Sequence, residues 1–240
     1  MERRVRRMNL KKLVTAAVCT MLMAAVAFTA GCGGEKKSDK KVLKVGMECA
    51  YAPYNWSQTK ADGGAVKIAG SNEYAYGYDV MMAKKLADSM GADLEIHKIE
   101  WDGLAPAVVS GKIDAAIAGM SITSKRKETV DFTKPYYYAT VVALVKKDSE
   151  QAKAQSVADL KGSVATSQLN TIWYDQIDQV PDVKKLPAID TVPGMIVALT
   201  SGKCNLIVTD IPTAKAAAFA NPELTVLNFE EGKGFKTSLE

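Results

Sequence analysis

The sequence has little of what most catalytic centres need. It contains one histidine, four cysteines and three tryptophans in 240 residues. The single histidine, His97, stands in the apolar stretch 94–99, so we expect it on the face of a strand, and no zinc or iron site follows from familiar ligand spacings. The sequence also lacks a Ser/His/Asp or Cys/His set, a glycine-rich phosphate loop and an obvious carboxylate pair. We therefore expect neither an enzyme nor a bound metal or cofactor.

An excess of one charge is also lacking once the first residues are set aside. The chain has 31 Lys and Arg against 27 Asp and Glu, a formal net charge of +4. Six of the basic residues and one acidic residue stand in positions 1–12, and removing them leaves 25 basic and 26 acidic residues, a net of −1. That balance favours no nucleic-acid or anionic-surface partner.

One long hydrophobic run is present, over residues 13–30, close to the lower length limit of a membrane span. It ends in Thr29-Ala30-Gly31-Cys32, before a polar, lysine-rich stretch. Small residues directly before a cysteine resemble the lipobox of bacterial lipoproteins, in which the cysteine is diacylated and becomes the new N-terminus. Thr29 departs from the usual leucine of that motif.

The lipobox resemblance implies a signal peptide over 1–31, a lipid on Cys32, a polar tether over 32–41 and an extracytoplasmic protein anchored to the cell membrane. The alternative is a plain transmembrane anchor. Either interpretation leaves two thiols in the folded part, Cys49 and Cys204, and we expect both to be unpaired.

From Val42 onward, short apolar runs alternate with amphipathic segments, which predicts strands and helices in turn. We expect strands over 42–47, 94–99, 113–118, 141–145, 163–166, 183–186, 206–209 and 224–227. We expect helices over 79–90 (capped by Asp79), 102–110, from 123, and over 156–160, 172–179, 192–200 and 213–220. Two such series predict an α/β protein with two lobes, over 42–136 and 137–230, each a mixed, mainly parallel sheet flanked by helices. Residues 57–73 are typical of a surface loop or hairpin insertion.

Ligands of open parallel sheets bind at the carboxyl ends of the strands, so the loops after the strands hold the candidate site. Arg126 follows Thr123 by three, and a guanidinium in a first helical turn suits a carboxylate. Thr171 can add a second carboxylate contact, and Asp210 can accept hydrogen bonds from an ammonium. Tyr51 and Trp101 can sandwich an aliphatic or cationic chain. Together these groups fit a zwitterion that carries a side chain.

Each of these residues has a simpler alternative. Arg126 stands among lysines and can be a solvated helix charge, and Asp210 can be only a helix cap. Tyr51 and Trp101 can be packing aromatics, and Tyr136 to Tyr138 suit the hinge between lobes better than the ligand.

A wider resemblance covers residues 42–230. It is carried by Tyr51-Ala52-Pro53-Tyr54, Gly77-Tyr78-Asp79, Trp101-Asp102-Gly103-Leu104, Gly111-Lys112-Ile113-Asp114, Ser121-Ile122-Thr123 with Arg126, and Asp131-Phe132-Thr133 with Pro135-Tyr136-Tyr137. In order and spacing these segments resemble the extracytoplasmic solute-binding proteins of ABC importers, family 3, which bind polar amino acids. The resemblance implies a two-lobed, type II periplasmic-binding-protein-like fold. It also implies a monomer that closes on an L-amino acid and delivers it to a membrane permease.

The resemblance also implies roles for individual residues. It gives the α-carboxylate to Arg126 and Thr171 with the Ser121 backbone, the α-amino group to the Gly119 carbonyl and Asp210, and the walls to Tyr51 and Trp101. Glu48 stands where lysine- and arginine-binding relatives keep an acid for the cationic end of the ligand, and glutamine-binding relatives keep one as well. We expect a basic amino acid, with glutamine or another polar amino acid as the alternative. A dehydratase of cyclohexadienyl type on the same scaffold is a further alternative.

Two departures from the family pattern bear on the fold. Asn170 replaces a glycine before Thr171, at a place where a positive φ is expected, and asparagine tolerates positive φ better than most residues. The family returns to its first lobe after the second, whereas this sequence stops at Glu240, so we expect residues 231–240 to begin the return and the first lobe to be incomplete.

Overall fold

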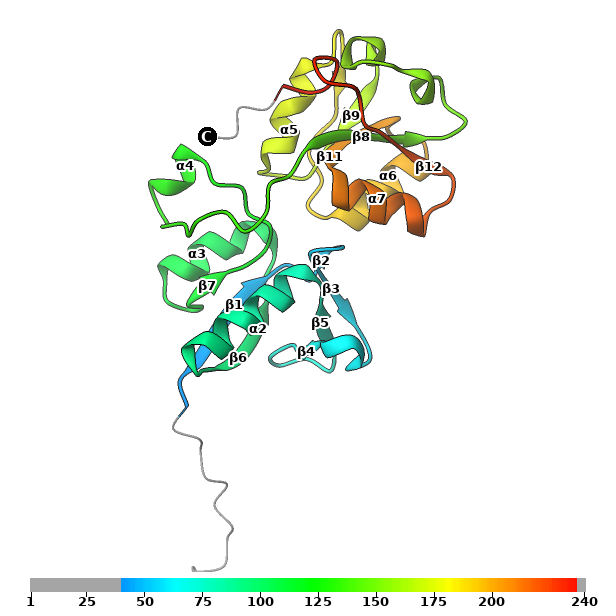
Figure 1. The fold of residues 1–240 in the computed structure, drawn as a ribbon. Coiled ribbons are helices and arrows are strands. Elements are labelled where there is room, and N and C mark those ends of the chain that lie inside the picture. The colour runs from blue at the N-terminus through cyan, green and yellow to red at the C-terminus, as the bar shows by residue number, and fades with distance from the viewer. Residues whose placement is uncertain (1–39, 237–240) are drawn as a thin grey trace, which may run out of the picture. The chain divides into compact units, whose positions relative to one another are not determined.

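The computed structural model describes residues 40–236, which Figure 1 shows in colour. The predicted signal peptide over 1–31, the predicted lipid site Cys32 and most of the predicted tether lie outside the described residues. Among the helices that are described, none is both long enough and apolar enough to cross a membrane.

Three parallel strands form the first sheet, in the order β6–β1–β7. They are β1 (Val42–Met47), β6 (Asp93–Lys98) and β7 (Ala115–Ala116). Leu43, Val45 and Met47 are all buried, as alternation along a strand requires. A Cβ at Gly46 would stand 2.4 Å from Cδ1 of Ile113, so a larger residue at this position would require the Ile113 side chain to shift. The strand predicted over 113–118 pairs only over the two residues of β7.

The first sheet is accompanied by four helical segments: α2 (Tyr78–Met90), η2 (Trp101–Gly103), α3 (Leu104–Val109) and α4 (Ser124–Lys127). Helix α2 ends at Gly91 in a left-handed conformation (φ 62°), as predicted. The prediction that Asp79 caps α2 is wrong, because the cap residue is Gly77 and the Asp79 side chain is fully buried in the first turn. Helix α2 packs on the core through Val80, Ala83 and Ala87, whereas Leu86 and Met90 are 39% and 55% exposed.

The stretch predicted as a loop or hairpin belongs to a second, antiparallel sheet of four short strands in the order β2–β3–β5–β4. They are β2 (Ala50–Tyr51), β3 (Asn55–Gln58), β4 (Val66–Lys67) and β5 (Tyr74–Tyr76), with the turn η1 (Asp62–Gly64) between β3 and β4. Two of these strands have only two residues, too few to show a period of two in the sequence. Its first strand, β2, is the next element after β1 in the chain. We call the first sheet, its helices and this antiparallel sheet together the first lobe.

The second lobe is built on a five-stranded mixed sheet in the order β10–β9–β11–β8–β12. Its strands are β8 (Val141–Lys146), β9 (Val164–Thr166), β10 (Lys184–Lys185), β11 (Leu206–Asp210) and β12 (Leu224–Leu227). Its helical segments are η3 (Glu150–Lys153), η4 (Val157–Leu160), α5 (Ile172–Gln176), η5 (Ile177–Gln179), α6 (Val192–Thr200) and α7 (Ile211–Ala220). β9, β10 and β11 are parallel, whereas β8 and β12 are antiparallel to their neighbours.

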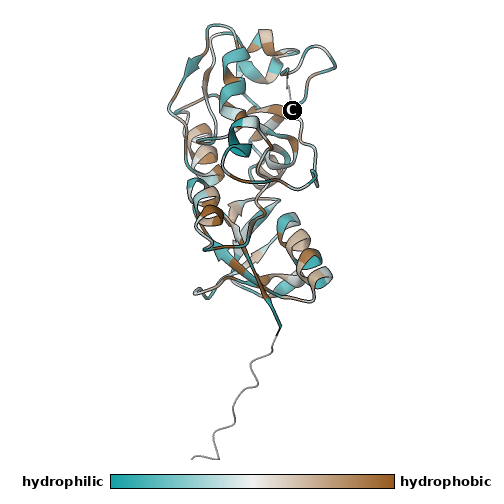
Figure 2. Ribbon diagram, turned by 90° about the vertical axis from the view of Figure 1, so that its left-hand side faces the viewer, coloured by the Kyte–Doolittle hydropathy of each residue, from teal (hydrophilic) through white to brown (hydrophobic). Residues whose placement is uncertain are grey.

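Apolar side chains cover both faces of the five-stranded sheet. Met195 and Leu199 of α6 and Ala217 of α7 pack on one face, where the two helices lie side by side in Figure 1. Trp173 and Ile177 pack on the other face. The hydropathy colouring in Figure 2 shows helices that carry both hydrophobic and hydrophilic residues, as helices that cover a sheet on one side do. Tyr51 and Tyr54 of the first lobe are part of the α6–α7 cluster, so the loop after β1 reaches across to the second lobe.

Candidate functional site

The carboxyl ends of strands from both lobes meet at one place. Residues that follow β1, β6, β7 and β9 in the chain line a narrow pocket. Its lining residues are Tyr51, Trp101, Gly119, Ser121, Arg126, Gln168, Thr171 and Trp173. Six of the eight predicted ligand-binding residues are therefore brought together. The remaining two do not line the pocket, but Glu48 bonds Gln168 and Asp210 bonds Tyr51, both of which do.

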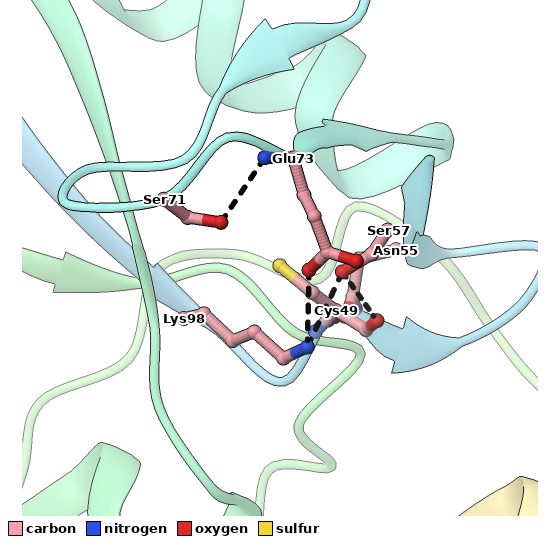
Figure 3. A network of polar contacts seen from close by, with 6 residues as sticks. All are labelled: Cys49, Asn55, Ser57, Ser71, Glu73 and Lys98. Atoms are coloured by element: carbon pink, nitrogen blue, oxygen red, sulfur yellow. Dashed lines mark hydrogen bonds and ion pairs between the residues drawn. The ribbon is translucent and has the colours of Figure 1, made fainter. Parts of the chain in front are cut away.

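The loop after β1 is held by a polar network, shown in Figure 3. Cys49 adopts a positive φ of 57°, its N–H donates to Asn55 Oδ1 (2.7 Å), and its carbonyl accepts from the Ser57 hydroxyl (3.3 Å). Lys98 Nζ donates to the same hydroxyl (3.4 Å) and pairs with Glu73 (3.6 Å). The Cys49 thiol is free, and burial raises its pKa to about 12. The network fixes the direction in which the flanking residues of this loop point.

A buried carboxylate joins that loop to the loop after β7. Asp79 accepts from Asn55 Nδ2 (2.7 Å) and from the Tyr136 hydroxyl (2.8 Å), and the Gly119 N–H donates to the same hydroxyl (3.0 Å). Burial raises the pKa of Asp79 to about 6, against the lowering effect of the two donors. No local spacing signals this arrangement, because Asp79 is 24 and 57 residues from its partners.

We call the contact between the two lobes the seam, and its buried part the inner end. There, Tyr51 donates its hydroxyl hydrogen to Asp210 Oδ2 at 2.5 Å. Asp210 Oδ1 accepts from the Thr213 N–H (2.9 Å), so the carboxylate also caps α7. Burial raises the pKa of Asp210, and hydrogen bonds from Tyr51 and Thr213 oppose that rise. The helix-cap interpretation of Asp210 is confirmed, and the same carboxylate bonds Tyr51, which lines the pocket. Tyr51 stacks on Tyr54 with ring centroids 4.8 Å apart.

Glu48 makes a second inner contact. Gln168 Nε2 donates to Glu48 Oε2 (3.0 Å) and to the Asp190 carbonyl (3.0 Å). The other oxygen, Oε1, is buried without a hydrogen-bond partner among the described residues. Burial raises the pKa of Glu48 to about 7, lowered in part by the Gln168 hydrogen bond and raised further by Glu100. Gln168 lines the pocket, but no feature of the sequence pattern signalled it as a site residue.

At the outer end of the seam, the Arg126 guanidinium lies over the Trp101 ring, 5.4 Å from its centroid. Nη1 donates to the Ser121 carbonyl (2.7 Å) and Nη2 to the Asn170 carbonyl (2.8 Å). Thr123 caps α4 and accepts from the Arg126 N–H (3.2 Å), which confirms the predicted helix start. Burial lowers the pKa of Arg126. Arg126 is therefore a pocket residue and not a fully solvated helix charge.

Thr171 and Asn170 complete the outer end from the second lobe. Thr171 occupies the cap position of α5, and its hydroxyl donates to the Gln168 carbonyl (2.7 Å). Asn170 has the expected positive φ, 53°. Its Nδ2 donates to Asp102 Oδ1 (2.8 Å), and its carbonyl accepts from Trp101 Nε1 (3.4 Å). The positive φ of Asn170 follows from its place in the sequence, whereas its contacts with the first lobe depend on residues far away in the chain.

The groups at this site can hold a polar, charged molecule. It combines a guanidinium, two buried carboxylates, hydroxyls and aromatic rings around a narrow space. Within residues 40–236 there is no group of three or more metal-ligating side chains. His97 lies on β6 with Nε2 2.7 Å from Glu95 Oε1, away from the pocket lining, as a strand-face residue would.

Known proteins resemble this chain in sequence and in fold. The sequence profile of the bacterial extracellular solute-binding proteins, family 3, matches residues 43–185. A probable histidine-binding protein of Campylobacter jejuni is 30% identical over 82% of this chain and 72% of the relative. ABC transporter arginine-binding protein 1 of Escherichia coli is 29% identical over 90% of this chain and 78% of the relative. The solved structure of an ancestral arginine-binding protein bound to glutamine matches with a TM-score of 0.68 and 30% identity, over 83% of each chain.

Proposed function

This chain belongs to the bacterial extracellular solute-binding proteins, family 3, and from that premise we propose that it captures a polar, basic L-amino acid between its lobes and delivers it to the permease of an ABC importer. The relatives bear names of amino-acid-binding proteins, and one of them is named for an ABC transporter. A pocket lined by residues of both lobes supports this proposal. The protein acts by binding and release, without turnover.

The backbone of the amino acid is held by groups of opposite charge. Arg126 uses two N–H groups on carbonyls, which leaves three of its five donors for the α-carboxylate, with Thr171 and the Ser121 backbone beside it. Asp210 and the Gly119 carbonyl hold the α-ammonium. The Tyr51 and Trp101 rings form the walls around the side chain.

The observation that carries the basic specificity is the unpartnered oxygen of Glu48. The side chain is 4% exposed, Gln168 occupies only Oε2, and Oε1 is left without a donor. A buried carboxylate oxygen is costly unless it accepts a hydrogen bond, and it is stabilised most by a cation. A guanidinium or ammonium at the end of the ligand supplies both. The neutral amide of glutamine supplies only the hydrogen bond, which keeps glutamine as the alternative.

The remaining assignments are also proposals. The lobes divide near residue 136, into 42–136 and 137–230, and the protein works as a monomer. A signal peptide over 1–31 and a diacylated Cys32 would hold the folded part at the outer face of the cell membrane, where an importer receives its solute.

The test is thermal unfolding of the full chain, freed of endogenous ligand, with each of the twenty amino acids and ornithine. At a hundred times its dissociation constant a ligand adds about 2.7 kcal/mol, which raises Tm by roughly 5–10 °C for a chain of this size. We expect the shift with arginine, lysine or ornithine. A shift confined to glutamine would replace the basic specificity by the alternative. A cooperative transition that no amino acid moves, combined with release of aromatic product from a cyclohexadienyl substrate, would favour the dehydratase.

A further inference from the structure

Asn170 ties the second lobe to two separate elements of the first. Its side-chain Nδ2 donates to Asp102 in η2 (2.8 Å). Its carbonyl accepts from Arg126 in α4 (2.8 Å) and from Trp101 in η2 (3.4 Å). All three partners belong to the first lobe, so these hydrogen bonds exist only while the lobes are together.

The backbone of Asn170 shows why its side chain matters. A φ of 53° is disfavoured for residues with a Cβ and open to glycine without strain. Glycine would also keep the carbonyl that Arg126 and Trp101 contact. What glycine lacks is the amide that reaches Asp102. Compared with glycine, asparagine is disfavoured by this backbone conformation, but it adds one hydrogen bond between the lobes.

The setting of that bond suits a contact that forms and breaks. Asn170 and Asp102 are both exposed, so water can replace either partner when the lobes separate. The acceptor is a carboxylate, which makes the hydrogen bond stronger than one between neutral groups. The inner contacts, Tyr51–Asp210 and Glu48–Gln168, are buried and lack this ready exchange with water.

We propose that Asn170 and Asp102 form a latch that stabilises the closed arrangement of the lobes and slows the release of the bound amino acid. The apparent affinity of a ligand rises with the populated fraction of the state that binds it, so a contact present only in the closed form strengthens binding without touching the ligand. The part of this proposal that concerns release rests on the proposed function. The part that concerns closure does not.

The test compares the full chain with Asn170→Gly. Small-angle X-ray scattering of the unliganded proteins measures closure, and stopped-flow measures release of L-arginine. We expect a larger radius of gyration for Asn170→Gly, and release about three- to tenfold faster, the range for losing one hydrogen bond. Asp102→Ala should have the same effect and add little in the double variant, because both substitutions remove one contact. Asp88→Ala, on the exposed side of α2, is the matched control and should change neither quantity.

An unchanged radius of gyration and release rate in Asn170→Gly overturns the latch, and so do additive effects of the two substitutions. The thermal unfolding midpoint of each variant shows that it folds, and the glycine at a positive φ should not lower it by strain. If the wild type binds no amino acid while Asn170→Gly still expands the unliganded protein, the latch is supported and the proposed function fails. If arginine binds and the variants match the wild type, the proposed function stands and the latch fails.

Discussion

The two ends of the seam between the lobes are built differently. At the inner end, Tyr51–Asp210 and Glu48–Gln168 are buried pairs whose carboxylates have raised pKa values. At the outer end, Asn170 meets its partners at exposed positions. Buried groups lose more when a partner is removed, because water cannot take its place. The inner end is thus suited to selecting the charge of a ligand, and the outer end to setting how readily the lobes part.

The largest expected effect is at the outer end of the seam, where Arg126 lies. Arg126→Ala should weaken amino-acid binding by more than about a hundredfold, because it removes the partner that we propose for the α-carboxylate. Isothermal titration calorimetry with L-arginine measures it. Lys125→Ala removes a charge from the same short helix and should leave the affinity unchanged, since Lys125 is exposed and does not line the pocket. Retained affinity in Arg126→Ala would show that the carboxylate binds elsewhere.

The next largest effect is at the inner end of the seam, where Glu48 is proposed to select the charge of the ligand. Glu48→Gln should weaken arginine and lysine by about tenfold or more while glutamine binds as well as before, because only cationic ligands lose an ionic partner. Calorimetric titrations with the three amino acids give the ratio. A parallel loss for all three would mean that Glu48 supports the pocket without selecting the ligand.

A smaller effect concerns the support of the inner end. Tyr136→Phe removes the hydroxyl between Asp79 and the Gly119 N–H, and we expect a loss of about 1–3 kcal/mol of unfolding free energy together with weaker amino-acid binding. Denaturant unfolding and calorimetry measure the two quantities. Tyr138→Phe is the matched control, because Tyr138 is 77% exposed and should tolerate the change. Equal stability of the two variants would contradict this role of Tyr136.

The smallest effect is on pH dependence. The pKa of Glu48 is about 7 in the folded protein against 4.5 for an unperturbed glutamate, so the folded state binds more protons between these values. Its contribution to stability is therefore present below pH 4.5 and is lost as pH rises through 7. Glu48→Gln lacks that contribution at every pH. The Tm of the variant minus the Tm of the wild type should therefore increase from pH 5 to pH 8. A difference independent of pH would place the pKa of Glu48 near its usual value.

Local signals in the sequence located much of the site. Thr123 and Arg126 three residues later marked the start of α4, and Asp210 stood at the end of an apolar strand that the structure also has. Because ligands of open sheets bind at the carboxyl ends of the strands, the residues after the strands were candidates, and six of them line one pocket. These features depend on short spacings or on the direction of a parallel strand, both of which are written in the local sequence.

What the sequence did not reveal depends on long-range contacts. Asp79 looked like a helix cap because its partners, Asn55 and Tyr136, are distant in the chain. The strands β2 and β4 are too short for a pattern, so their sheet was predicted only as a loop or hairpin. The contacts of Asn170 need both lobes in place, which no spacing within one segment encodes.

Within residues 40–236 the free thiols are Cys49 and Cys204, and their reactivity can report on unfolding. Cys49 is buried in the core of the first lobe and Cys204 in the cluster beneath α6 and α7, and burial raises the pKa of both. Alkylating reagents attack the thiolate, so both side chains stay inert at neutral pH until the surrounding core opens. Mass-spectrometric mapping of alkylation at these two positions during mild denaturation would therefore time the opening of each core separately, without any introduced label.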